Sequence, residues 1–306
     1  PGGGGAPGGG GAPGGGGAPG GGGAPGGGGA PGGGGSAAGG GAGGGAGNCP
    51  AAPAGSDADQ TAALAAVNKA RLAMGVPCSA LVSSISTAAE KHCLYYTTNT
   101  GSCIANPHAE VAGCKNFVAA SFGGRMKAAG YTGSPASEVM VFGPDPNGAV
   151  KMWIDSVWHR TPVLSPWVRE LGYGNATGCG VMDLGVGAAT PNTVIAKWPY
   201  DKQTGVPLAF SGNEGPKPPA PPSGWPSGYP VTLYAKSPVI TEHTLVVEGT
   251  TADIPHVWIA GDALLSKSAV VLYAHKPLQA KTTYRVHIKG TFVGGPLDEQ
   301  WTFTTQ

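Results

Sequence analysis

Charged residues are scarce in this sequence. Asp, Glu, Lys and Arg make up 11% of its 306 residues, whereas soluble domains typically contain about 25%. The formal net charge is +1 and no basic block occurs, so the electrostatic footprint of a nucleic-acid-binding protein is missing. No apolar run is long enough to cross a bilayer. We therefore expect no nucleic-acid partner and no transmembrane segment, and the sparse charge favours an extracellular setting.

Several catalytic signatures are missing as well. The sequence contains no G-x-S-x-G, no H-E-x-x-H and no C-x-x-C. These absences exclude the nucleophile elbow of serine hydrolases, the zinc helix of metalloproteases and the paired cysteines of common zinc sites. From the sequence alone we expect a protein that is not an enzyme.

Cysteine is absent after residue 179. The six cysteines are Cys49, Cys78, Cys93, Cys103, Cys114 and Cys179. An even number confined to one segment indicates up to three disulfides and an oxidising compartment, and the spacing does not choose among the pairings. We expect an extracellular or cell-surface location, with an export signal removed or lying before the given sequence.

The N-terminal region is a repeat. PGGGGA occurs five times and is followed by PGGGGS, and a glycine-alanine tract continues to residue 48. One interpretation is a flexible linker that holds a domain away from a cell surface. The other uses the six-residue period, which equals two turns of polyproline II and leaves one edge of the rod entirely glycine. Such a rod would associate with other copies of the chain through residues 1–36. The sequence leaves both interpretations open.

Hydrophobic patterns predict an α+β domain over residues 49–210. Helices are expected at about 56–74, 83–96, 116–129 and 147–158, and strands at 170–174, 179–184 and 193–199. Helices followed by a small sheet are typical of the α+β class. His159 then lies at a helix end, because Pro162 and Pro166 do not allow the helix to continue.

The remaining sequence has a different pattern. Residues 211–228 are rich in proline, glycine and serine and predict a stiff, extended linker. Residues 229–306 contain only strand patterns separated by turn residues. Short strands at this spacing predict a small β-sandwich.

A series of motifs runs through residues 57–200. In order they are VNKARLAMG, a histidine at 108, FGGRMKAAGY, SEV, AVKMWIDSVWHR and RELGYG. In this order they resemble the bacterial branch of the CAP superfamily (cysteine-rich secretory, antigen 5 and pathogenesis-related proteins), with SEV in place of the family's GEN. The resemblance implies a secreted, disulfide-bonded α-β-α sandwich with a shallow cleft lined by histidines and glutamates.

The resemblance places His108, Glu138 and His159 in that cleft. The match is incomplete, because Val139 replaces the asparagine of GEN and Ser156 stands where eukaryotic members carry a second glutamate. Ser156 and Glu170 are assigned as supporting residues. The acidic residues available as substitutes for the second glutamate are Glu110, Asp155 and Glu170.

The chemistry of this cleft has two interpretations. Two imidazoles, His108 and His159, together with a carboxylate offer the donors that a divalent metal such as zinc takes. Alternatively, His159 hydrogen-bonds Glu138 and ties a helix to a strand. His92 is expected to cover a helix face, and Arg160 to cap helix carbonyls or pair with a carboxylate.

The C-terminal stretch KPLQAKTTYRVHIKGTFVGGPLDEQWTFTT resembles the last strands of bacterial Ig-like domains. The matching residues are Pro277, Leu278, Thr283, Tyr284, Val286, Trp301, Phe303 and Thr304. The resemblance implies a spacer or adhesion unit without catalytic residues of its own.

Together these patterns predict a modular secreted protein. The expected parts are a polyproline-II-like tail (1–48), a CAP-like domain (49–210), a linker (211–228) and an Ig-like sandwich (229–306). The favoured role is structural or adhesive, with assembly through the tail and with cell-surface or matrix components as partners. A cleft that binds a lipid or a metal ion is the alternative, and an extracellular hydrolase is a third possibility for which no nucleophile is found.

Overall fold

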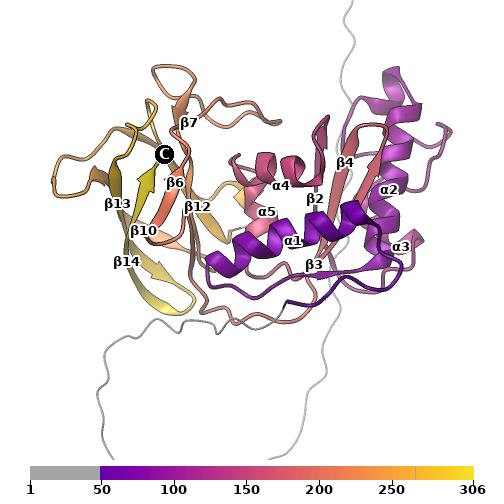
Figure 1. Ribbon diagram of the computed structural model, residues 1–306, viewed down its shortest axis with the longest axis horizontal. Coiled ribbons are helices and arrows are strands. Elements are labelled where there is room, and N and C mark those ends of the chain that lie inside the picture. Colours follow the sequence, from indigo (N-terminus) through magenta and orange to yellow (C-terminus); the bar gives the residue numbers. More distant parts are fainter. Residues whose placement is uncertain (1–48, 266) are drawn as a thin grey trace, which may run out of the picture. The chain divides into compact units, whose positions relative to one another are not determined.

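The computed structural model describes residues 49–265 and 267–306. The PGGGGA tail lies outside these residues, so its conformation and its self-association stay predictions. The described chain combines helices and sheets, which confirms the α+β class (Figure 1). No helix within 49–265 or 267–306 has both the length and the hydropathy needed to cross a bilayer.

The N-terminal part of the described chain is built on a four-stranded sheet with the order β1-β3-β4-β2. Its strands are β1 (Ala80–Leu81), β2 (Pro135–Phe142), β3 (Glu170–Ala176) and β4 (Cys179–Gly185). The helices are α1 (Ala58–Ala73), α2 (Ser83–Thr98), α3 (Phe122–Ala128), α4 (Pro146–Ile154) and α5 (Arg160–Leu164).

Helices cover both faces of this sheet. Gly172 and Gly174 of β3 face α2, and a Cβ atom on either would lie within 2.1 Å and 2.0 Å, respectively, of backbone nitrogens of α2. Only glycine permits so close an approach. Because side chains alternate along a strand, Tyr173 points to the other face. There it packs edge to face on Trp153 of α4, with ring centroids 6.4 Å apart.

Capping residues explain where the helices begin. Asp57 accepts a hydrogen bond from the backbone N–H of Gln60 at 2.7 Å, and the Gln60 side chain accepts from the Asp57 N–H at 3.3 Å. This reciprocal capping box fixes the first turn of α1. The helix expected at 116–129 starts later, because Ser121 caps α3 and the N–H groups of residues 118 and 119 donate to Glu110 instead.

The corner after α4 differs from the expectation. Helical structure resumes in α5, which contains Pro162 in its first turn. Proline is tolerated there because its missing N–H would have no partner inside the helix. Arg160 is fully buried at this corner. It donates to the carbonyl of Ile154, as expected for a capping role, and also to the carbonyl of Pro230 and, at 3.2 Å, to Thr232 Oγ1.

All six cysteines form disulfides, which confirms that expectation. The pairs are Cys49–Cys78, Cys93–Cys179 and Cys103–Cys114. The second pair joins α2 to the start of β4 and closes a loop of 86 residues. Such bonds persist in oxidising compartments, so the pairing supports a secreted protein.

The C-terminal part forms two four-stranded sheets with the orders β10-β13-β14-β6 and β11-β12-β9-β5. The six strands predicted after residue 229 are β9 (Val231–Tyr234), β10 (Val239–Val247), β11 (His256–Ile259), β12 (Ala269–Ala274), β13 (Thr283–Phe292) and β14 (Gly295–Thr305). Buried residues of both sheets belong to one hydrophobic cluster. The Ig-like assignment stays a prediction.

Two strands of these sheets come from residues assigned by sequence to the first domain. β5 (Ala196–Trp198) pairs with β9, and β6 (Gln203–Val206) pairs in parallel with β14. The boundary expected at residue 210 is therefore wrong, because the sheets of the C-terminal part already include residue 196. Partners this far away in the sequence leave no local signal.

The segment 211–228 is not an extended linker. Its flanks pair with each other as β7 (Ala209–Phe210) and β8 (Ser227–Gly228). Trp225 packs against Phe210 and Tyr273, with ring centroids 5.4 Å and 5.8 Å apart. The intervening residues form a loop anchored at both ends, which we call the proline loop (211–226).

We predict that the three disulfides differ in their contribution to stability. Replacing Cys93 and Cys179 together by alanine should lower the free energy of unfolding more than replacing Cys103 and Cys114 together. The first pair closes 86 residues and the second closes 11, and loop-closure entropy makes the difference about 2 kcal/mol. Urea unfolding of the two double variants checks this, and equal losses would contradict it.

Candidate functional site

A cleft of about 340 Å³ lies between β2, α4 and the proline loop. Its apolar lining is Met140, Val141, Phe142, Met152 and Trp153. Its polar lining includes His108, Ser156, His159, Asn213 and Glu214. Phe142 and Met152 are 50% and 47% exposed. The cleft therefore combines large apolar side chains, half open to solvent, with a polar wall that carries two histidines.

His108 forms one side of the polar wall. Its Nδ1 lies 2.9 Å from Glu138 Oε1. The histidine side chain is 38% exposed, whereas the Glu138 side chain is 1% exposed. Glu138 is held in place by β2 and by a hydrogen bond from Arg125 Nη2. The carboxylate thus orients the imidazole and leaves Nε2 as the ring nitrogen available to a ligand.

Behind His108 lie five buried ionisable residues, which we call the buried charge cluster: His92, Glu110, Arg125, Glu138 and Asp183. His92 Nδ1 lies 3.0 Å from Glu110 Oε1, and its Nε2 lies 2.8 Å from the Pro107 carbonyl. Glu110 Oε2 also accepts from the N–H of Val118 at 2.7 Å. Burial of charge is tolerated here because each carboxylate of Glu110 and Glu138 faces a partner.

His92 and Glu110 have a larger role than the sequence analysis gave them. The expectation that His92 only covers a helix face is incomplete, because its side chain is fully buried. A signal for burial was present: His92 continues the buried face of α2 that starts with Ile85, Ala88 and Ala89. Glu110 pairs with His92 inside the cluster and does not line the cleft.

Glu138 and Asp183 are neighbours across the β2–β4 pair. Burial raises the pKa of Asp183 well above its ordinary value, and the negative charge of Glu138 raises it further. Burial alone would also raise the pKa of Glu138, but the hydrogen bond from His108 and the charges of His92 and Arg125 lower it. Neither Asp183 oxygen accepts a hydrogen bond from another described residue. Of the two carboxyl groups, Asp183 is therefore the one that favours the protonated form.

His159 forms the opposite side of the polar wall, at the start of α5. Its Nδ1 lies 3.0 Å from Glu214 Oε2. Glu214 also accepts from the N–H groups of Val157 at 2.7 Å and Trp158 at 2.9 Å. The sequence analysis missed Glu214 because composition alone assigned its segment to a linker. It is the only acidic residue in 211–228, and that was the available signal.

The structure brings some of the predicted site residues together. His108 and His159 line the same cleft, and Glu138 reaches it through its hydrogen bond with His108. His159 pairs with Glu214 and not with Glu138. Ser156 lines the cleft, but its hydroxyl donates to the Trp153 carbonyl at 2.7 Å.

The other two acidic candidates do not line the cleft and bond other residues. Glu170 accepts a hydrogen bond from Tyr131 at 2.6 Å and does not line the cleft, so a supporting role there is wrong. Asp155 accepts from Tyr229 at 2.8 Å and pairs with Lys151. Glu214 therefore supplies the second carboxylate of the cleft.

The cleft residues do not fit a metal site. Glu138 and Glu214 bond the Nδ1 atoms, which leaves two imidazole Nε2 atoms as donors. Protein zinc sites use three or four protein ligands. Residues 49–265 and 267–306 contain no group of three or more His, Cys, Asp or Glu arranged to hold a metal ion. We derive no chemistry through a metal here.

No family model matches the sequence, and no curated protein matches it either. A solved structure with some similarity is an extracellular protein containing an SCP domain from Bacillus anthracis, with a TM-score of 0.35 and 17% identity. The similarity covers 42% of this chain and 40% of that chain, so this chain matches less than half of that protein. The family assignment stays a prediction from the sequence motifs.

We predict that Asp183→Asn stabilises the protein at neutral and higher pH. The folded state holds a proton on Asp183 that the unfolded chain releases above its ordinary pKa of about 3.9. Stability therefore falls as the pH rises from that value towards the folded pKa, and asparagine removes this loss. The melting temperature should exceed that of the wild type by about 2–4 °C for each kcal/mol recovered.

The same melting curves, recorded between about pH 4 and pH 8, separate this effect from a general change of charge. The advantage of Asp183→Asn should shrink towards the acidic end. Glu90→Gln, which neutralises an exposed carboxylate on α2, should show no such trend. If Asp183→Asn is destabilised equally at both ends of this pH range, the carboxyl group of Asp183 is not protonated in the folded protein.

Proposed function

We propose that this protein is an extracellular binding module whose cleft takes a medium-chain fatty acid. The observation that carries the proposal is the placement of two half-exposed apolar side chains, Phe142 and Met152, in one cleft with His108 and His159. Apolar surface beside a few convergent polar groups is typical of a small-molecule site. The three disulfides support the extracellular setting.

The polar wall suits a carboxylic head group. Each cleft histidine is oriented through Nδ1 by a buried carboxylate, so its Nε2 can meet a ligand. A protonated imidazole donates to a carboxylate, and a neutral one accepts from a carboxylic acid. The apolar side chains of β2 and α4 then contact the acyl chain.

Binding is favoured over catalysis by the state of the cleft hydroxyl. Ser156 donates its hydroxyl hydrogen to the Trp153 carbonyl. Both cleft histidines are bonded to carboxylates, and no hydrogen bond in the described part of the chain joins either of them to a Ser, Thr or Cys side chain. An activated nucleophile needs such a contact with a base.

We predict that affinity for saturated fatty acids increases with chain length. Each methylene buried in the cleft contributes about 0.8 kcal/mol, which is about a fourfold gain in affinity per carbon. Isothermal titration calorimetry of the full chain with octanoate, decanoate and dodecanoate, each below its micelle concentration, should show this gain. Affinity independent of chain length would contradict the proposal.

Substitutions test whether dodecanoate binds in the cleft. Met152→Gln should weaken dodecanoate binding, because it removes apolar lining, and His108→Gln should weaken it by removing a head-group contact. Leu72→Gln is the matched control, since Leu72 is a similarly exposed apolar residue (45%) on α1 that does not line the cleft. Equal effects of Met152→Gln and Leu72→Gln would indicate non-specific adsorption.

The repeat favours a second, separate role in assembly. PGGGGA recurs with a period that places glycine along one edge of a polyproline II rod. Ordering each residue costs about 1–2 kcal/mol of backbone entropy, so an ordered tail would require contacts among several chains. We propose that residues 1–36 mediate self-association of the secreted protein.

A truncation that begins at Cys49 tests the assembly role. We expect it to keep the melting temperature of the full chain, because the described fold lies within residues 49–306, and to lose any multimer. Analytical ultracentrifugation of both chains over a concentration series gives the comparison. If the two chains sediment alike, the tail is only a spacer.

A further inference from the structure

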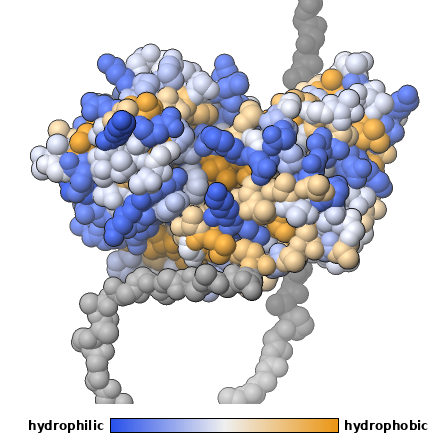
Figure 2. Space-filling view, in the orientation of Figure 1, coloured by the Kyte–Doolittle hydropathy of each residue, from blue (hydrophilic) through white to orange (hydrophobic). Residues whose placement is uncertain are grey.

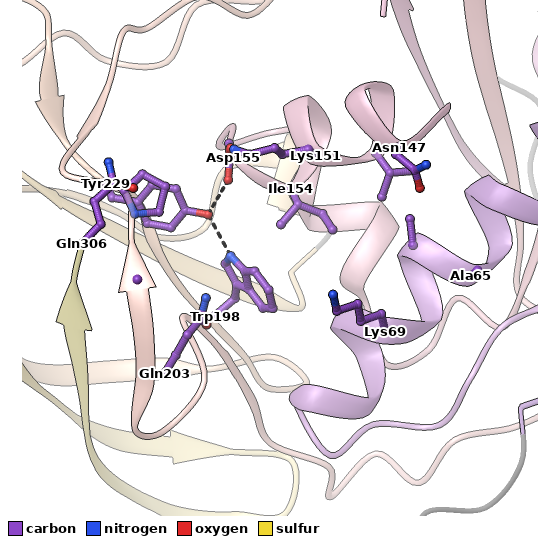
Figure 3. Close-up of a pocket in the computed structure, with 14 residues that line it drawn as sticks. Ala65, Lys69, Asn147, Lys151, Ile154, Asp155, Trp198, Gln203, Tyr229 and Gln306 are labelled. Atoms are coloured by element: carbon purple, nitrogen blue, oxygen red, sulfur yellow. Dashed lines mark hydrogen bonds and ion pairs between the residues drawn. The ribbon is translucent and has the colours of Figure 1, made fainter. Parts of the chain in front are cut away.

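A second cavity, about 560 Å³ in volume, opens between α1, α4 and the strands β5 and β6. It shares no lining residue with the cleft. Figure 2 shows a hollow in this face with hydrophobic residues inside it and both hydrophilic and hydrophobic residues at its rim. Figure 3 shows that its walls carry aromatic, amide and charged side chains. We call it the α1–β5 cavity.

The wall formed by the strands is aromatic and fixed in place. Trp198 Nε1 donates to the Tyr229 hydroxyl at 3.0 Å, and that hydroxyl donates to Asp155 Oδ1 at 2.8 Å (Figure 3). The guanidinium of Arg160 lies 4.8 Å from the centre of the Tyr229 ring. These contacts lock the orientation of the Trp198 indole before any ligand arrives, which lowers the entropic cost of binding.

A lysine without an ion-pair partner lies at the edge of the α1–β5 cavity. Lys151 is paired with Asp155. Lys69, an exposed residue of α1, forms no ion pair with any residue in the described part of the chain, and Figure 3 shows it pointing towards Trp198. Gln203 accepts from the Tyr200 N–H at 3.1 Å through its carbonyl oxygen, which leaves its amide nitrogen to donate to a ligand.

We infer that the α1–β5 cavity binds a uronic-acid unit of an acidic polysaccharide. A sugar ring has an apolar C–H face that packs on the part of the Trp198 indole open to the cavity, and hydroxyl groups at its edge that bond amides. The carboxylate of a uronic acid adds a charge-assisted hydrogen bond with Lys69. This inference is independent of the fatty acid proposed for the cleft.

Other ligand classes fit the same lining less well. A hydrocarbon chain would displace water from Lys69, Gln203 and Asn147 and offer these polar side chains no hydrogen bond in return. A neutral sugar would leave the charge of Lys69 unused. A nucleotide would also use an aromatic wall and a cation, so it serves as the competing outcome in the experiment.

Titration calorimetry of the full chain with trigalacturonate tests the inference. We expect saturable binding at low salt, and binding about tenfold weaker for the fully methyl-esterified trimer, which lacks the charges. Lys69→Ala should weaken trigalacturonate binding by a similar factor and abolish the preference over the ester. Lys91→Ala, which removes an exposed lysine of α2 away from the cavity, should leave both affinities unchanged.

Gln203→Ala provides a variant that keeps the lysine. It should weaken the acid and the ester to the same extent, because the amide contacts hydroxyl groups common to both. Circular dichroism melting curves confirm that each variant is folded. The inference is overturned if trigalacturonate gives no heat at millimolar concentration, if adenosine monophosphate binds and trigalacturonate does not, or if Lys69→Ala and Lys91→Ala have the same effect.

Discussion

The hydrogen bonds of the Glu214 carboxylate hold the corner on which the rest of the structure depends. Its two oxygens accept from backbone N–H groups of residues 157 and 158 and from the His159 ring. The N–H groups of residues 157 and 158 lie between α4 and α5, so the carboxylate satisfies backbone donors that belong to neither helix. It also anchors the proline loop and sets the direction of His159. One side chain therefore fixes a helix start, a loop and a wall of the cleft.

Arg160, the residue after His159, connects the same corner to the C-terminal part of the chain. Its buried guanidinium bonds the end of α4 and the carbonyl of Pro230, just before β9. The Tyr234 hydroxyl donates back to the Arg160 carbonyl at 3.1 Å. The cleft and the α1–β5 cavity lie on either side of α4, so the shape of both depends on how these contacts position one short helix.

The sequence predicted those features that depend on neighbouring residues, on the order of motifs or on a residue count. The start of α1 follows from its capping box, and the six strands after residue 229 follow from alternating apolar residues and turns. The oxidised state of the cysteines follows from their number and confinement. The order of the motifs predicted that His108 and His159 share a cleft, and both residues line the same cleft in the structure. Each of these needs only neighbouring residues or a count.

The features that sequence reasoning missed depend on partners far away along the chain. Glu214 meets His159 across 55 residues, and composition gave its segment the role of a spacer. β5 lies within the strand expected at 193–199, whereas no strand was expected at β6, and only the partners β9 and β14 show which sheets these strands join. Asp183 is one acidic residue in an apolar strand, and its raised pKa follows from burial and from the charge of Glu138 on the neighbouring strand. Such properties belong to the assembled structure.

The parallel pairing of β6 with β14 has a consequence for the timing of synthesis. Gln203 pairs with Phe303, so β6 leaves the ribosome about a hundred residues before its partner. At about 5–20 residues per second, that interval lasts roughly 5–20 s. During this time the first sheet and its helices can complete their contacts, while β6 presents an unpaired edge. The chain also cannot be divided into two independent parts at the proline loop. A C-terminal fragment that keeps all of its strands would have to begin before residue 196, within the range that composition alone assigns to the first domain.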